Sequence, residues 1–81
     1  MLEALDIHVT GVVQGVGFRP FVYRAAKRNL VSGWVLNAVD GVDIHAEGES
    51  RLLDTFVIEI SEHSPAAARV DEILMHEAPL E

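Results

Sequence analysis

Four stretches of the chain carry the hydrophobic pattern of β-strands. In residues 5–10 and 42–47 every second residue is apolar, which predicts strands with one buried and one solvated face. Residues 31–37 and 70–76 are also predicted as strands, and the uneven alternation of the last stretch suggests a β-bulge. We expect Gly48 to end the third strand, because glycine weakens a strand interior.

Two further stretches carry the pattern of helices. Between residues 20 and 29 apolar residues recur at helical spacing, with Pro20 suited to the first helical position and Asn29 to the C-terminal end. The second helix is expected to follow an N-cap at Ser50 and to end before Pro65. Its predicted buried stripe consists of Leu52, Leu53, Phe56, Val57 and Ile60.

The resulting order of elements is βαββαβ, which predicts an α+β fold. Each predicted helix has a single apolar stripe, so both should pack on one face of a four-stranded antiparallel sheet and leave the other face in solvent. An Asp-Gly pair within residues 38–41 predicts the hairpin turn between the second and third strands. These features define a ferredoxin-like sandwich, and we expect residues 1–81 to form a single domain.

A glycine-rich loop joins the first strand to the first helix. Its three glycines permit positive φ angles and close approach of the backbone, so consecutive amides can turn inward around a small anion. The loop ends at a helix N-terminus, where free N–H groups and the helix dipole favour negative charge, and Arg19 adds a guanidinium. The predicted phosphate-binding residues are Gln14, Gly15, Val16, Gly17, Phe18 and Arg19.

Such a loop also occurs where a chain only needs to bend sharply, and the local pattern leaves that alternative open. The spacing of the glycines fits neither GxxxxGK[ST] nor GxGxxG, so a nucleotide site of either kind is not indicated.

Two sequence motifs resemble the signatures of the acylphosphatase family. Residues 13–19 read Val-Gln-Gly-Val-Gly-Phe-Arg, similar to the first signature, which forms the phosphate loop of that family. Residues 33–41 contain Gly-Trp-Val-Leu-Asn and an Asp-Gly pair, similar to the second signature. Within the family, residues 17–24 and 64–71 most resemble the acylphosphatase-like N-terminal domain of the hydrogenase maturation carbamoyltransferases.

The resemblance implies an enzyme that hydrolyses an acyl phosphate by attack of water at phosphorus. Arg19 and the loop amides would bind the phosphate, Asn37 would position the water, and these two side chains are the predicted catalytic residues. An amide cannot act as a general base, but it can orient a water by accepting one of its protons. Good alignment alone can be worth about 7–11 kcal/mol. No cofactor and no metal are implied.

The relation to carbamoyltransferases implies a more specific substrate and context. The substrate would be carbamoyl phosphate, and the carbamate and phosphate formed would serve downstream domains of a larger protein in hydrogenase maturation. Two alternatives stay open, namely a stand-alone acylphosphatase of general specificity and a noncatalytic module that binds anions or a partner domain. The presence of both Arg19 and Asn37 favours an enzyme.

Charge and composition narrow the classes of partner. The net charge of −7 argues against nucleic acid, which is bound through surplus Lys and Arg, and it requires any phosphate site to attract its ligand locally. Four of the six basic residues meet that need, since they lie on the loop or in the helix after it: Arg19, Arg24, Lys27 and Arg28.

No apolar run approaches the ~18 residues of a membrane span, the first six residues are acidic where a signal peptide would be basic, and cysteine is absent. We therefore expect a cytoplasmic protein with no membrane partner.

The remaining polar residues give weaker indications. The four histidines lack HxH and HExxH spacing, and although His8 and His45 lie on neighbouring predicted strands, we expect polar surface there and no metal site. Trp34 is expected to lie in the core or to shape the site. The acidic residues of the second helix and last strand are expected to be solvated, among them Glu59.

Overall fold

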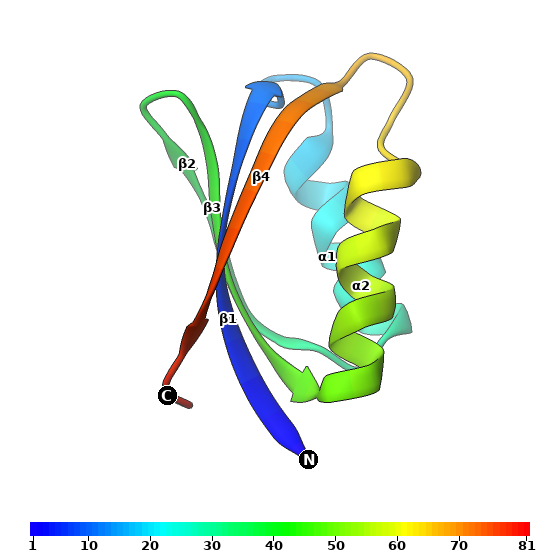
Figure 1. The fold of residues 1–81 in the computed structure, drawn as a ribbon. Helices are drawn as coiled ribbons and strands as arrows, with labels where there is room; N and C mark the ends of the chain where they lie inside the picture. Colours follow the sequence, from blue (N-terminus) through cyan, green and yellow to red (C-terminus); the bar gives the residue numbers. More distant parts are fainter.

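A computed structural model describes residues 1–81 as a single antiparallel sheet covered on one face by two helices (Figure 1). The elements are β1 (Leu2–Val12), α1 (Phe18–Arg28), β2 (Ser32–Ala38), β3 (Gly41–Glu49), α2 (Ser50–Glu62) and β4 (Arg69–Ala78). The strand order is β2-β3-β1-β4, so β1 and β3 are central and β2 and β4 form the edges. The predicted ferredoxin-like fold is confirmed. Neither helix is long and apolar enough to cross a membrane.

The strand register separates a buried face from an open face. Ile7 pairs with Ile44 and Val9 with Val42, and all four side chains are buried beneath the helices. The helices contribute mainly aromatic and branched residues to this core: Phe18, Phe21, Val22, Leu53, Phe56 and Ile60. Since side chains alternate along a strand, the polar residues between these positions, beginning with Asp6, lie on the face that no helix covers.

Two predicted helix starts are wrong by one or two residues. α1 begins at Phe18, after an N-cap at Gly17 with a left-handed φ of 80°, because burial of the Phe18 ring extends the apolar stripe toward the loop. Pro20 is therefore the third helical residue, where a missing N–H still costs no intrahelical bond. α2 begins at Ser50 itself, and the N-cap is Glu49 without a side-chain capping bond.

Of two glycines in the central strands, only one marks an irregularity of the sheet. Gly48 does not end β3 as predicted, because it pairs with Glu3 of the central strand, and pairing overrides the weak strand preference of glycine. The predicted bulge is present: the register of β1 against β4 shifts between Thr10 and Gly11, which leaves Asp71 as the additional residue of β4. Gly11 has a φ of +130°, and a Cβ there would lie 2.1 Å from the Arg69 carbonyl oxygen.

The C-terminal end of α1 is joined to α2 by polar contacts. Asn29 is buried and donates hydrogen bonds through Nδ2 to the Ala25 carbonyl at 2.8 Å and to Glu59 Oε1 at 3.0 Å. Glu59 also forms an ion pair with Arg28. The expectation that Glu59 is merely solvated is therefore wrong, because its carboxylate links the two helices.

Candidate active site

The loop between β1 and α1 has the backbone pattern of an anion cradle. Gly15 and Gly17 have φ angles of 71° and 80°, whereas Val16 and Phe18 have negative φ. Alternation of this kind turns successive N–H groups toward a common point. None of the backbone N–H groups from Gln14 to Arg19 donates a hydrogen bond to another backbone group. Six consecutive donors at a helix N-terminus are therefore available to an anion.

Apolar side chains hold this loop in place. Val13 and Phe18, on either side of the glycines, are each 1% exposed, and Val16 packs against the same core. The Phe18 ring also packs against Phe21, with ring centroids 5.6 Å apart. Of the predicted phosphate-binding residues, Val16 and Phe18 can thus contribute only backbone amides, while their side chains fix the loop before a ligand arrives.

Gln14 connects the loop to the β2–β3 hairpin, a role that sequence analysis missed. Its Nε2 donates hydrogen bonds to the carbonyl of Ala38 at 2.5 Å and to that of Gly41 at 2.8 Å. These carbonyls flank the two-residue turn, so one amide group holds both strands of the hairpin against the loop. No local pattern reveals this contact, because its partners lie more than twenty positions away in the sequence.

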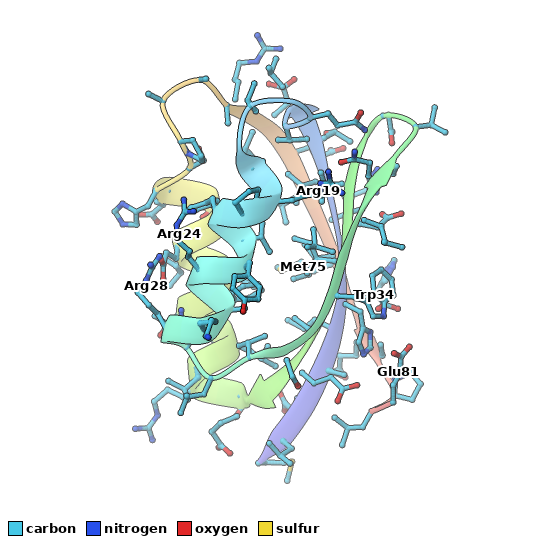
Figure 2. All side chains as sticks on the ribbon, turned by 180° about the vertical axis from the view of Figure 1, so that it is seen from behind. Arg19, Arg24, Arg28, Trp34, Met75 and Glu81 are labelled. Atoms are coloured by element: carbon cyan, nitrogen blue, oxygen red, sulfur yellow. The ribbon has the colours of Figure 1, made fainter.

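Arg19 lies at the N-terminal end of α1. Figure 2 shows its side chain on the side of the helix toward the sheet, whereas Arg24 and Arg28 point away from the sheet. Arg19 is exposed and makes no ion pair, and the first turn of α1 contains no acidic residue. Its guanidinium is consequently free to bind an anion held by the neighbouring amides.

Asn37 lies on β2, close to the same end of the molecule. It pairs with Val42 of β3, and because Val42 is fully buried under the helices, Asn37 projects from the helix-covered face of the sheet. Its side chain is exposed and makes no hydrogen bond in the protein. The Gln14 contacts hold the loop at the turn that follows β2, so the structure brings the two predicted motifs to one end of the fold.

The tryptophan and three of the histidines lie on the other face of the sheet, since His76 pairs with Asp6 there. Trp34 is 43% exposed and stacks on His45 with ring centroids 5.7 Å apart, so it is neither in the core nor on the face that carries Asn37. His45 is only 3% exposed, which corrects the expectation of an ordinary surface histidine. Its hydrogen bond with Asp6 is the main cause that raises the pKa of His45.

His8 also lies on this face, paired with acidic residues. Its Nδ1 donates to Asp43 at 2.5 Å and its Nε2 donates to Asp40 at 2.9 Å. The Asp43 hydrogen bond is the main cause that raises the pKa of His8. From β4 the directly opposite residue is the uncharged Leu74, with the titratable Glu72 and His76 two residues to either side on the same face. Neither histidine is positioned to act on a ligand in the loop, because the sheet lies between them.

The fold and the loop define a class: a small α+β sandwich with a glycine-rich loop of unpaired backbone amides at the N-terminus of its first helix. The chain belongs to the acylphosphatase family, whose model matches residues 5–81. It is therefore a member of a hydrolase family that acts on acyl phosphates.

Relatives fall into two groups. Carbamoyltransferase HypF2 of Cupriavidus necator is 52% identical over 69 residues, which cover 85% of this chain and 9% of that protein. The acylphosphatase of Thermotoga maritima is 51% identical over 67 residues, covering 82% of this chain and 74% of that protein. The chain thus spans about a tenth of the length of the carbamoyltransferases that it matches.

Solved structures divide in the same way. Full-length HypF in a phosphate- and nucleotide-bound form matches the whole chain with a TM-score of 0.96 and 38% identity, over 11% of that protein. The acylphosphatase of Bacillus subtilis also matches the whole chain, with a TM-score of 0.89 and 39% identity, over 89% of that protein.

Proposed function

We propose that this chain hydrolyses carbamoyl phosphate to carbamate and phosphate, as an acylphosphatase-type domain. The observation that carries the proposal is the row of six free backbone N–H groups between Gln14 and Arg19, next to an unpaired guanidinium. These donors suit a tetrahedral dianion such as phosphate. They also explain how a chain with a net charge of −7 binds an anion, since the attraction is local.

The proposed reaction needs positioning and charge stabilisation more than proton transfer. The loop amides and Arg19 bind the phosphoryl oxygens, and Asn37 orients a water for attack at phosphorus on the side away from the leaving group. The carboxylate-type leaving group departs readily, and the phosphate oxygens can take up the proton of the water. No titrating side chain of the protein is required, in agreement with the place of His8 and His45 on the far face of the sheet.

The choice of carbamoyl phosphate rests on likeness to HypF. The chain is about equally identical to HypF2 and to a stand-alone acylphosphatase. The TM-score is 0.96 for full-length HypF, against 0.91 and 0.89 for two stand-alone acylphosphatases, whereas a second HypF structure gives 0.88. The same likeness favours a role in hydrogenase maturation beside downstream domains of a larger protein. A stand-alone acylphosphatase of general specificity is the second candidate, favoured by the relatives of similar length. The cytoplasmic location expected from the sequence stays a prediction.

Phosphate release from carbamoyl phosphate and from acetyl phosphate tests the proposal. We expect kcat/KM to be higher for carbamoyl phosphate after subtraction of its spontaneous decomposition. A preference for acetyl phosphate would support the general enzyme, and no release from either substrate would support a noncatalytic module.

The variant Arg19→Ala tests the cradle itself. Loss of one strong donor to the developing charge costs about 10²- to 10³-fold in rate, and here it should also weaken inhibition by inorganic phosphate, because the same guanidinium binds the ground state. Arg24→Ala is the matched control, since Arg24 is exposed on the same helix but points away from the sheet (Figure 2). An Arg19→Ala variant that binds phosphate with unchanged affinity would contradict the assigned role.

A further inference from the structure

The open face of the sheet collects acidic residues without basic partners. β1, β2 and β3 contain no Lys or Arg, and the single Arg of β4, Arg69, is paired with Asp71. The carboxylates on this face therefore rely on histidines for compensating charge, apart from Glu49, which forms an ion pair with the N-terminal ammonium group. The densest group surrounds His45, which contacts three carboxylates.

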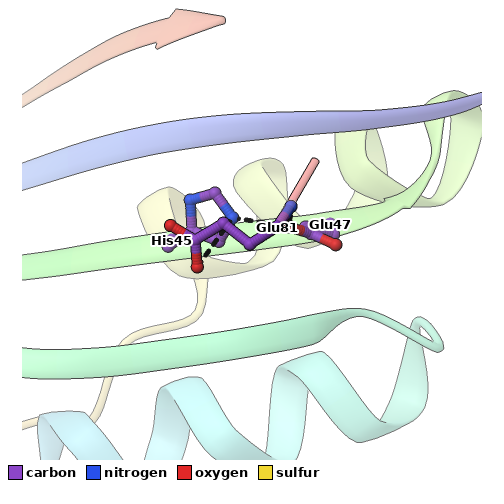
Figure 3. A group of neighbouring side chains, drawn as sticks. All are labelled: His45, Glu47 and Glu81. Carbon is purple, nitrogen blue, oxygen red and sulfur yellow. Dashed lines mark hydrogen bonds and ion pairs between the residues drawn. The ribbon is translucent and has the colours of Figure 1, made fainter. Parts of the chain in front are cut away.

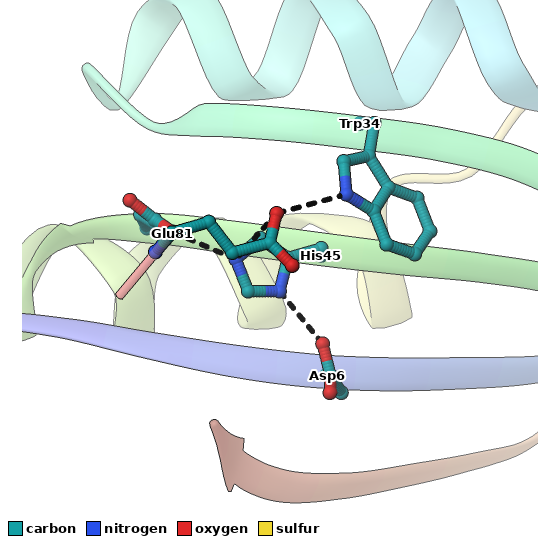
Figure 4. A network of polar contacts seen from close by, with 5 residues as sticks. Asp6, Trp34, His45 and Glu81 are labelled. Atoms are coloured by element: carbon teal, nitrogen blue, oxygen red, sulfur yellow. Dashed lines mark hydrogen bonds and ion pairs between the residues drawn. The ribbon is translucent and has the colours of Figure 1, made fainter. Parts of the chain in front are cut away.

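His45 is held rigidly within this group (Figure 4). Its Nδ1 donates a hydrogen bond to Asp6 Oδ1 at 2.7 Å, and the face of its ring packs on Trp34. Because the Asp6 contact occupies Nδ1, the other ring nitrogen, Nε2, points along the strand toward Glu47 and Glu81. A histidine oriented through one nitrogen by a carboxylate, with the other nitrogen presented to a ligand, is the usual arrangement of a metal-binding histidine.

Two carboxylates converge on that second nitrogen (Figure 3). His45 Nε2 donates a hydrogen bond to Glu47 Oε2 at 2.8 Å, and Glu81 Oε1 lies 3.8 Å from the same nitrogen. A metal ion bound here would replace the proton of Nε2, because only the deprotonated nitrogen is a ligand. Glu81 is in turn held by Trp34, whose Nε1 donates to its Oε1 at 3.4 Å, and by its own backbone N–H, which donates to Glu47 Oε2 at 2.6 Å. The three potential ligand atoms all lie within 4.8 Å of one another.

We propose that His45, Glu47 and Glu81 bind a divalent transition-metal ion such as Zn²⁺. One imidazole nitrogen and two carboxylate oxygens form a ligand set that zinc accepts, with a fourth position left to water. With bonds of about 2.0–2.2 Å, tetrahedral ligands lie roughly 3.4 Å apart. The two distances from Nε2, 2.8 and 3.8 Å, lie on either side of that value, so the three side chains would have to rotate only slightly to bind an ion. Binding would place positive charge among carboxylates that have no Lys or Arg partner.

His8, another histidine on this face, provides an internal comparison. The two carboxylates near His8 lie on opposite ring nitrogens, with Asp43 at Nδ1 and Asp40 at Nε2. They do not converge on one nitrogen, so the His8 group lacks the geometry of a site. The spacing of histidines in the sequence could not indicate the site at His45, because the other two ligands are carboxylates. Glu47 lies two residues later on the same strand, and Glu81 lies far away in the sequence.

The site is independent of the proposed hydrolysis, since it lies on the opposite face of the sheet from the loop. The test is calorimetric titration of the untagged chain with ZnCl₂ in a buffer without phosphate, together with the visible absorption of Co²⁺, which reports tetrahedral coordination. We expect one ion per chain. Glu47→Gln and Glu81→Gln should each weaken binding by at least about tenfold, as should Asp6→Asn, which removes only the group that orients His45.

Two controls keep the result interpretable. His8→Gln should bind Zn²⁺ like the unmodified chain. Since substitution of the buried His45 risks unfolding, the decisive variants are Glu47→Gln and Glu81→Gln, with circular dichroism to verify that they fold. The proposal is overturned if the unmodified chain binds no ion, if both folded Gln variants bind as tightly as the parent, or if binding disappears in His8→Gln.

Discussion

The Gln14 side chain offers the sharpest test of how this fold builds its site. Replacing it by alanine removes two hydrogen bonds, to the Ala38 and Gly41 carbonyls. A typical hydrogen bond contributes about 0.5–1.5 kcal/mol. Because the Ala38 contact is exposed and water can replace it, we expect a loss of about 1–2 kcal/mol in the free energy of unfolding, measured by urea denaturation.

The effect of Gln14→Ala on activity should be larger than its effect on ligand binding. The loop amides and Arg19 form one unit, so the inhibition constant of inorganic phosphate should change little. The hairpin that carries Asn37 would instead lose its connection to that unit. A displacement of about 1 Å between reacting groups can cost on the order of 10²-fold, so kcat should fall by roughly 10- to 100-fold. An unchanged kcat, or a loss of phosphate affinity with kcat intact, would refute the reasoning.

Three further predictions concern other parts of the molecule. Asn37→Ala should lower kcat far more than it raises KM in steady-state assays, since only the position of the water is lost; an intact kcat with a raised KM would indicate a binding role. Because its hydrogen bond with Asp43 raises the pKa of His8 in the folded state, this contact should stabilise the fold fully below about pH 6.5 and less as the pH rises through the folded-state value. The difference in unfolding free energy between the parent and His8→Gln should therefore shrink from pH 5.5 to pH 8.5, with the pH profile of kcat/KM unchanged in shape. Gly33→Ala should destabilise by more than about 3 kcal/mol, because a Cβ there would lie 1.8 Å from the His45 carbonyl oxygen at a φ of +142°, combining backbone strain with overpacking. Gly15→Ala, with nothing within 4 Å, should cost only about 1–2 kcal/mol; equal denaturation midpoints for these two variants would contradict the argument.

The order of the elements and the buried faces were predictable because they rest on local periodicity. Alternation placed Ile7 and Val9 on the buried face of their strand, and helical spacing placed Phe21 and Val22 in the core; all four are buried in the structure. The start of α1 was missed because Phe18 belongs both to the loop motif and to the apolar stripe of the helix. The local sequence pattern does not show where the loop ends and the helix begins.

The errors on the open face have a different cause. Periodicity assigned His45 correctly to the solvated face of the sheet, but its burial depends on Trp34 from an edge strand and on carboxylates from β1 and the end of the chain. Likewise, Gln14 gains its role only when the hairpin forms. Contacts between residues distant in sequence decide both cases, so residue type and spacing carry no signal for them.

The central position of β1 also has a consequence for the order in which the chain can fold. Both strands that pair with β1 are distant from it in the sequence. Leu2 pairs with Glu49 of β3, and Ala4 pairs with Ala78 of β4. Sheets built from such distant pairings fold more slowly than helical bundles, because large loops must close before contacts form. Before these loops close, β1 exposes apolar side chains and unpaired backbone edges, which favour association with other chains. The loop of residues 14–19 lies between β1 and the β2–β3 hairpin, so it is complete only when the sheet has formed. Phosphate should therefore slow the unfolding of the native state and should not accelerate the early steps of folding.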